Sequence, residues 1–374
     1  MGLAHSPKIV TDGLAFIYDT GSGKSYKGEP TVNLLNYTTE FNNWTATKNS
    51  GTTPTVTVDT SVNPLGLAGA PMADKVYLPD DGTYPRIQQS FTPASTNTHT
   101  FSVWIRSISG NCDCFLGAFR NSPWSLPGSS VKSITGEWQR FTFSWTPPDT
   151  TTHVIYMGSH DTAAQKGNTL EFWGAQMEAK SHATQFVDGT RSATQGLLDL
   201  TNNATINLSN VSFDSNAQMV FDGTDDYTSL GNPTALRDLT SGTIETVYYR
   251  DASSGTYQMV FTDAGSDLEI TYLGNTLQFY IGNSGLSYTH AVTDQWFNVV
   301  GTWSSGFKKL YINGVEVASG TNTGTDTGNR DRYVGGRGAN FPFNGEIPIA
   351  RIYDRALTAD EILQNYNAFK SRFL

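Results

Sequence analysis

Two pairs of acidic residues have the type and spacing to attempt acid–base chemistry: Glu171 with Glu178, and Asp267 with Glu269. Retaining glycoside hydrolysis requires two carboxyl groups about 5 Å apart, one as nucleophile and the other as acid. Side chains alternate between the faces of an ideal strand, so Glu171 and Glu178 are expected on opposite faces. The sequence also lacks a Gly-x-Ser-x-Gly elbow and a His-Glu-x-x-His motif. We therefore expect a protein that is not an enzyme.

A second kind of chemistry is sugar recognition by aromatic rings beside side chains that hydrogen-bond hydroxyl groups. Such sites lie on loops between rigid strands. Proline and glycine neighbours place several candidates in loops, although for Trp124 and Phe341 a core position remains equally open. Six other tryptophans lie in alternating segments and are expected in the core: Trp104, Trp138, Trp145, Trp173, Trp296 and Trp303. The carbohydrate-binding candidates are Tyr84, Arg86, Trp124, Tyr333, Arg337, Asn340 and Phe341.

Asp222, Asp225 and Asp226 cluster around a tight turn and are candidate calcium ligands. Calcium prefers several hard oxygen ligands, which loops supply. The alternative is turn chemistry, in which an aspartate accepts hydrogen bonds from its own backbone. We favour the turn interpretation and keep structural calcium as the possible cofactor.

These candidates need a scaffold, and the sequence predicts an all-β one. Only 16% of residues are charged and 36 are glycine, a composition suited to short strands and tight turns. Apolar and polar residues alternate over 100–106 and 140–145, which is typical of strands with one wet face. Asn313-Gly314 predicts a hairpin of type I′. A capping box at Thr358 and Glu361 predicts a helix of about three turns near the C-terminus.

Charge and hydropathy exclude some partners. The net charge is −10 and the longest basic run is Lys308-Lys309, so we expect no nucleic-acid partner. No apolar run approaches 18 residues, so we expect no membrane insertion. The first ten residues lack the pattern of a secretion signal. Cys112 and Cys114 are too close in sequence for a normal disulfide and are expected as reduced thiols.

The C-terminal half resembles the concanavalin-A-like, laminin-G-like lectin domains of phage structural proteins. The resemblance rests on a Phe-Asp-Gly motif at 221–223, on Leu-Tyr-Ile-Asn-Gly at 310–314, and on the segment 350–366. It covers roughly 190–374. The segment 9–19 looks like the opening strand of the same domains, whose continuation appears only at 196–203. Residues 1–32 plus 190–374 are thus expected to form one discontinuous domain.

The intervening residues 33–189 resemble the carbohydrate-binding jelly-roll modules of phage tail and fibre proteins. The segments that match are 33–44, 101–105, 137–143 and 170–178. The expected fold is therefore two antiparallel β-sandwiches with a short C-terminal helix. Jelly rolls of this type often hold a structural calcium near their first and last strands, and the resemblance suggests Glu40, Asp74 and Glu178 as ligands.

The expected function follows from these resemblances. It is a non-enzymatic bacteriophage virion protein at the particle surface, either a tail-fibre or receptor-binding component or a capsid decoration. Its expected partners are other virion proteins and host-surface polysaccharide, and a homo-oligomer is expected, with a trimer favoured. One alternative is a secreted bacterial polysaccharide-binding adhesin, which would need an export signal. Another is a glycan-cleaving tailspike, which would need paired carboxylates.

Overall fold

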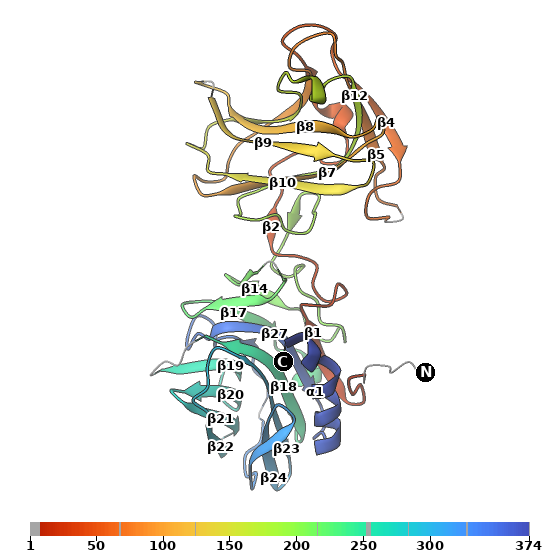
Figure 1. The fold of residues 1–374 in the computed structure, drawn as a ribbon. Helices are drawn as coiled ribbons and strands as arrows, with labels where there is room; N and C mark the ends of the chain where they lie inside the picture. Colours follow the sequence, from red (N-terminus) through yellow and green to blue (C-terminus); the bar gives the residue numbers. More distant parts are fainter. Residues whose placement is uncertain are drawn as a thin grey trace, which may run out of the picture. The chain divides into compact units, whose positions relative to one another are not determined.

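The computed structural model describes residues 8–66, 69–123, 125–214, 216–251, 256–282, 284–326 and 328–373. The chain divides into two compact units (Figure 1). Unit 1 consists of Met1–Pro30 with Ser192–Leu374, and unit 2 of Thr31–Arg191. Each is built from antiparallel strands, as the period-two patterns predict, so the all-β fold class is confirmed.

Unit 1 is a sandwich of two sheets, with eight and seven strands among the residues described. The first sheet contains, in order, β15 (Ser212–Phe213), β16 (Met219–Asp222), β27 (Asn344–Tyr353), β18 (Gly242–Arg250), β23 (Trp296–Ser304), β24 (Phe307–Ile312) and β25 (Val315–Gly320), and β1 (Leu14–Asp19) pairs with β27. The second contains β14 (Asn207–Ser209), β17 (Tyr227–Gly231), β26 (Arg332–Val334), β19 (Tyr257–Asp263), β20 (Leu268–Leu273), β21 (Thr276–Ile281) and β22 (Ser284–Thr289). Their apolar faces share one core, in which Tyr248 and Ile352 meet Val260 and Phe279.

Unit 1 is assembled from two distant parts of the sequence. β1 pairs with β27 from Leu14↔Tyr353 to Asp19↔Ile349. Asp199, which follows unit 2 in the chain, accepts a hydrogen bond from the backbone N–H of Ile17 at 3.1 Å. The opening strand is thus held by residues that lie more than 180 positions later.

Helix α1 (Ala359–Phe373) lies on the outer face of the eight-stranded sheet, where Phe369 packs against Val247 and Ile349. Its capping box forms as predicted: Thr358 N donates to Glu361 Oε2 at 2.9 Å, and Glu361 N donates to Thr358 Oγ1 at 3.3 Å. The hairpin prediction is also confirmed, because Asn313 and Gly314 both have positive φ between β24 and β25. No described helix is long and apolar enough to span a membrane.

Unit 2 is a second sandwich of two five-stranded sheets in the described residues. One contains β10 (Gln139–Trp145), β7 (His99–Ser107), β12 (Asn168–Glu178), β5 (Ala73–Leu78) and β4 (Thr55–Ser61). The other contains β3 (Thr45–Thr47), β6 (Arg86–Phe91), β11 (His153–Gly158), β8 (Cys112–Arg120) and β9 (Ser125–Ile134). Phe101 and Phe172 of the first sheet face Ile87 and Leu116 of the second. Short 3-10 helices complete the chain: Phe41–Asn43, Ala163–Gln165 and Thr234–Leu236.

Several predictions about buried residues are settled by this packing. Cys112 and Cys114 are both free and buried, as expected. Trp145, Trp173 and Trp303 are core residues. The prediction was wrong for Trp104, Trp138 and Trp296, which are only half-buried. Trp104 and Trp296 lie on the outer faces of β7 and β23, and Trp138 precedes β10.

The ends of unit 2 are paired with each other. β2 (Thr31–Val32) and β13 (Thr190–Arg191) form a two-stranded ladder, and Thr31 Oγ1 donates to the buried Glu178 at 2.9 Å. We propose that unit 2 is an independent domain bounded by this ladder, two residues outside the 33–189 limits that the sequence suggested.

A fragment of residues 31–191 is therefore expected to unfold cooperatively by itself in urea, followed by tryptophan fluorescence. Fragment 33–189 lacks the ladder and the Thr31–Glu178 hydrogen bond, and should be less stable by about 1–2 kcal/mol. Equal stabilities, or failure of the longer fragment to fold, would contradict the proposed boundaries.

Candidate functional site

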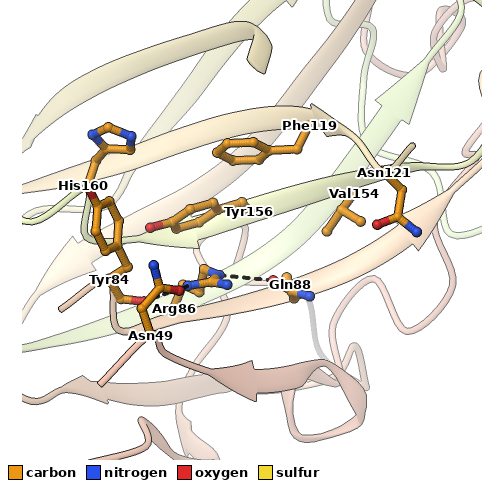
Figure 2. A pocket seen from close by; sticks show the side chains of 9 residues that line it. All are labelled: Asn49, Tyr84, Arg86, Gln88, Phe119, Asn121, Val154, Tyr156 and His160. Atoms are coloured by element: carbon orange, nitrogen blue, oxygen red, sulfur yellow. Dashed lines mark hydrogen bonds between the residues drawn. The ribbon is translucent and has the colours of Figure 1, made fainter. Parts of the chain in front are cut away.

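One candidate site is an open cavity of about 490 Å³ on unit 2 (Figure 2), here called the unit 2 cleft. It lies on the outer face of the sheet that contains β6, β11 and β8. Aromatic and amide side chains line it, together with one arginine: Asn49, Tyr84, Arg86, Gln88, Phe119, Asn121, Val154, Tyr156 and His160.

Strand register explains how these residues meet. Tyr156 on β11 is paired with Gln88 on one side and with Gly117 on the other. Their neighbours Ile87, Ile155 and Leu116 point into the core, so the alternate positions must point outward. Three strands that are remote in sequence thereby place one row of side chains on the same face.

Stacked rings form the floor of the cleft. Phe119 and Tyr156 lie 5.1 Å apart with an interplanar angle of 24°. Gly117 lies between Phe115 and Phe119 on β8 and leaves room for both rings. A Cβ at this position would lie 2.6 Å from the Phe115 ring and 3.2 Å from the Phe119 ring. Burial raises the pKa of the Tyr156 phenol, whose Oη donates to the carbonyl of Ser159. The floor is therefore neutral and rigid, and both of its rings are only 4% exposed.

Arg86 is held against this floor by a set of hydrogen bonds. Its Nε donates to Gln88 Oε1 at 3.0 Å, and its Nη1 donates to Asn49 Oδ1 at 3.2 Å and to the Tyr84 carbonyl at 2.9 Å. The guanidinium carbon lies 5.1 Å from the centre of the Tyr156 ring. These contacts fix the orientation of the guanidinium group beside the stacked rings.

The predicted residues Tyr84 and Arg86 both line this cleft. Figure 2 shows Tyr84 beside His160 at one end, with Asn121 and Val154 at the other. Trp124, also predicted, lies outside the described residues. The sequence missed Phe119, Tyr156 and the three amides. Alternation on each strand was a usable signal, but it does not say which strands are neighbours.

Unit 1 has a second cavity, of about 370 Å³, on the outer face of β19, β20 and β21. Two of the predicted sugar-binding residues, Arg337 and Phe341, line it. The guanidinium carbon of Arg337 lies 4.9 Å from the centre of the Phe341 ring. Phe341 is 39% exposed, which decides the open question in favour of a surface position. Tyr333 and Asn340 do not line the cavity: Tyr333 packs against Tyr227, and Asn340 makes backbone hydrogen bonds with Arg337.

Glu269 is the acidic residue of this second cavity. Burial raises its pKa, opposed by a hydrogen bond from Thr262 Oγ1 at 2.8 Å. Asp267, its predicted partner in acid–base chemistry, does not line the cavity and pairs with Arg330 at 3.1 Å. The structure thus does not bring these two carboxylates to one described cavity.

Residues 222–363 match the concanavalin A-like lectin/glucanases superfamily. This laminin-G-type match covers most of the second segment of unit 1, Ser192–Leu374. It includes all residues that line the second cavity. No curated protein matches the chain.

Solved structures that match about half of the chain come from proteins of several kinds. Domain 4 of a GH43 extracellular arabinanase from Geobacillus stearothermophilus, in complex with arabinotriose, is 20% identical with a TM-score of 0.38, over 47% of this chain and 93% of that one. The binding domain of botulinum neurotoxin DC, in complex with rat synaptotagmin II, is 15% identical with a TM-score of 0.40, over 47% and 50%. Trypanosoma rangeli sialidase, in complex with the inhibitor DANA, is 14% identical with a TM-score of 0.39, over 47% and 31%. The matched part therefore spans half or less of the latter two chains.

The other carboxylate pair corrects a prediction. Glu171 and Glu178 lie on the same face of β12, because the ladder with β7 shifts by one residue between Trp173 and Gln176. Gly174, with φ +64°, occupies this bulge. Glu171 is bound by Arg106 at 2.6 Å, and Glu178 by Thr184 at 2.6 Å. Both are buried, so each serves the packing of this face.

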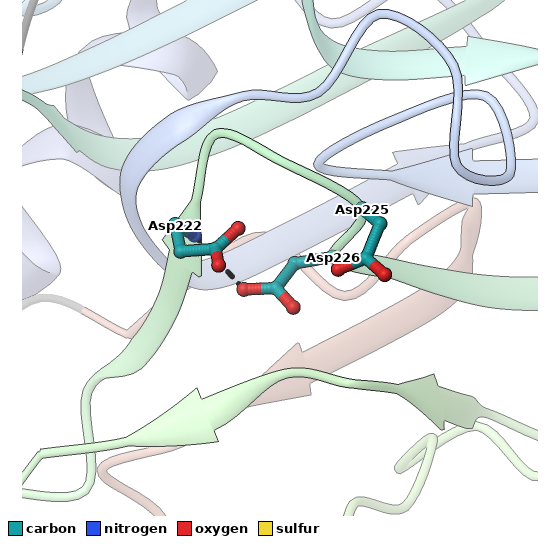
Figure 3. Close-up of side chains that lie close together, drawn as sticks. All are labelled: Asp222, Asp225 and Asp226. Carbon is teal, nitrogen blue, oxygen red and sulfur yellow. Dashed lines mark hydrogen bonds between the residues drawn. The ribbon is translucent and has the colours of Figure 1, made fainter.

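The predicted aspartate cluster does form (Figure 3). Carboxylate oxygens of Asp222, Asp225 and Asp226 lie within 4.8 Å of one another. Asp226 Oδ2 accepts the N–H of Asp222 at 2.8 Å, and Asp222 Oδ1 accepts the N–H of Thr224 at 2.8 Å. Burial raises the pKa of Asp226, and the two neighbouring carboxylates add to this. These hydrogen bonds are those of the turn interpretation, and calcium at this turn stays a prediction.

The second predicted calcium group is only partly brought together. Glu40 and Asp74 line one small cavity with Asp59. Asp74 accepts hydrogen bonds from the N–H groups of Phe41 at 2.7 Å and Asp59 at 3.0 Å, and burial raises its pKa. Glu178 is not among the lining residues, because its carboxylate binds Thr31 and Thr184 beside the β2–β13 ladder.

A pH effect is expected at Glu346, which lines a further cavity of unit 1. Burial, followed by repulsion from Asp214 and Asp251, raises its pKa from 4.5 to about 7. The folded state therefore binds the proton more tightly, so this residue's stabilising contribution is lost as pH rises from about 4.5 to about 7. In thermal melts, Glu346→Gln should be more stable than wild type by about 1 kcal/mol at pH 8 and equal to it at pH 4.5. Glu316→Gln, at an exposed pair with Lys309, is the control, and an unchanged pH profile in Glu346→Gln would contradict the assignment.

Proposed function

We propose that this protein binds glycans without cleaving them, and that the unit 2 cleft makes the principal contact. The observation that supports this is the combination of the half-buried Tyr84 ring with an oriented arginine and amide side chains, in one open cavity above a floor of buried, stacked rings. Rings pack against the apolar faces of sugars, while amides and guanidinium groups hydrogen-bond their hydroxyls. A concave site with few convergent polar groups is the usual form of a ligand site.

Binding without cleavage is favoured because acidic residues are missing from the described lining of the cleft. None of the described residues that line the unit 2 cleft is aspartate or glutamate. Glycoside hydrolysis ordinarily uses two carboxyl groups across the scissile bond. The rival proposal of a glycan-cleaving tailspike would gain support if the protein released oligosaccharides from a polysaccharide that it binds.

We further propose that the protein is displayed on a bacteriophage particle, where glycan binding would serve attachment to a host. This proposal rests on the sequence resemblance to phage structural proteins. It includes a homo-oligomer that binds other virion proteins. Mass spectrometry of purified particles tests it. Absence of the chain from particles, with secretion by a bacterium, would favour the adhesin alternative.

Tyr84→Asn tests the cleft. Tyr84 has φ +56°, which asparagine tolerates, so the ring is removed with little backbone strain. Binding to the best ligand on a glycan array should weaken about tenfold, in line with the loss of one aromatic contact. Tyr37→Asn is a matched control, because Tyr37 has φ +52°, is 52% exposed and does not line the cleft. Unchanged binding in Tyr84→Asn would exclude this cleft as the glycan site.

A further inference from the structure

The charge of Arg86 has no described partner of opposite sign. The hydrogen-bond acceptors of its guanidinium group are the amide oxygens of Gln88 and Asn49 and the carbonyl of Tyr84, which are all neutral. By contrast, Arg120 on the same sheet pairs with Asp149, and Arg106 on the opposite sheet pairs with Glu171. Arg86 is also the only Lys, Arg, Asp or Glu among the described lining residues.

An anionic ligand could supply the opposite charge that the oriented guanidinium group lacks among its described partners. Arg86 is half-buried, and its neighbours reduce contact with water, so an anion bound there would interact more strongly than at an open surface. Nε and Nη1 of Arg86 already donate to protein acceptors, so the N–H groups of Nη2 are the ones left to bind a carboxylate through a charge-assisted hydrogen bond. The remaining surface of the cleft suits a sugar ring, with Phe119 and Tyr156 below and Asn49, Gln88 and Asn121 around it.

We propose that the unit 2 cleft recognises a sugar that bears a carboxylate, such as a uronic acid, with Arg86 binding the carboxylate. This inference rests on the proposed glycan-binding function and names the class of glycan. A net negative protein would then bind an acidic glycan through one local positive site, rather than through its overall charge.

The experiment compares tri-galacturonic acid with its methyl ester, which keeps the rings and hydroxyls but removes the charge. An array of other uronate- and sialate-containing oligosaccharides, each with its methyl ester, extends the comparison to other linkages. Affinity is measured by titration calorimetry for wild type, Arg86→Gln, Arg86→Lys and the control Arg120→Gln. Arg120→Gln removes the same charge from the same sheet, but this charge is already paired with Asp149.

We expect wild type and Arg120→Gln to bind at least one acid about tenfold or more tighter than its ester. Arg86→Gln should bind both forms equally, and Arg86→Lys should keep part of the preference. Equal binding of acid and ester by wild type, with both weakened in Tyr84→Asn, would overturn the inference and leave glycan binding intact. A preference retained in a folded Arg86→Gln would also overturn it. No binding of any array member, acidic or neutral, would overturn both proposals.

Discussion

Replacing Arg332 by methionine is expected to lower the free energy of unfolding of unit 1 by about 3–5 kcal/mol. Arg332 is 1% exposed and lies between two fully buried carboxylates. Its Nη1 donates to Asp263 at 2.8 Å, and its Nη2 donates to Asp326 at 2.7 Å and to the carbonyl of Leu236 at 2.9 Å. Methionine fills similar space but leaves both carboxylates charged and buried without a counter-ion.

The matched control is Arg330→Met, two residues earlier in the same segment. Arg330 is 38% exposed and pairs with Asp267, so its loss should cost at most about 1 kcal/mol. Because the chain has two units, unit 1 is best followed by hydrogen exchange of peptides from β19 and β26 in increasing urea. A loss of less than about 1 kcal/mol in Arg332→Met would show that the ion-pair network does not stabilise the sandwich.

Replacing Asp199 by alanine is expected to destabilise unit 1 by about 3 kcal/mol and to loosen its first strand. The buried carboxylate accepts hydrogen bonds from four backbone N–H groups, those of Ile17, Thr201, Asn203 and Ala204, at 2.9 to 3.1 Å. Alanine would leave these donors without an acceptor at a position that is only 4% exposed. An asparagine side chain retains one acceptor oxygen, so the stability of Asp199→Asn should lie between that of the alanine variant and that of wild type.

Asp222→Ala is the control for this change. Asp222 is exposed and its carboxylate accepts one backbone hydrogen bond, from Thr224, so its loss should cost less than about 1 kcal/mol. Urea unfolding with hydrogen exchange of a peptide that covers β1 separates the two effects. Faster exchange of β1 in Asp199→Ala but not in Asp222→Ala is expected. Unaltered exchange there would mean that Asp199 does not hold the first strand.

The proposed site was only partly predictable from the sequence. Tyr84 and Arg86 could be named because proline and a turn mark a loop whose chemistry suits a sugar. Phe119 and Tyr156 lie within strands and could not, since alternation assigns a residue to a face but does not say which face is open. Arg332 shows the converse: it precedes the predicted sugar-binding residue Tyr333, yet it is buried in an ion-pair network with Asp263 and Asp326.

The sequence by itself determined the all-β class, the Asn313-Gly314 hairpin and the capped C-terminal helix. These depend on local preferences, such as positive φ at a turn and the pairing of Thr358 with Glu361, and so they survive in any tertiary context. Only the tertiary structure decided the order and register of the strands. That register places Gln88, Tyr156 and Gly117 side by side, and the bulge at Gly174 brings Glu171 and Glu178 to one face. The physical reason is that register is selected by long-range packing of the core, where a shift of one residue reverses the face of every following side chain.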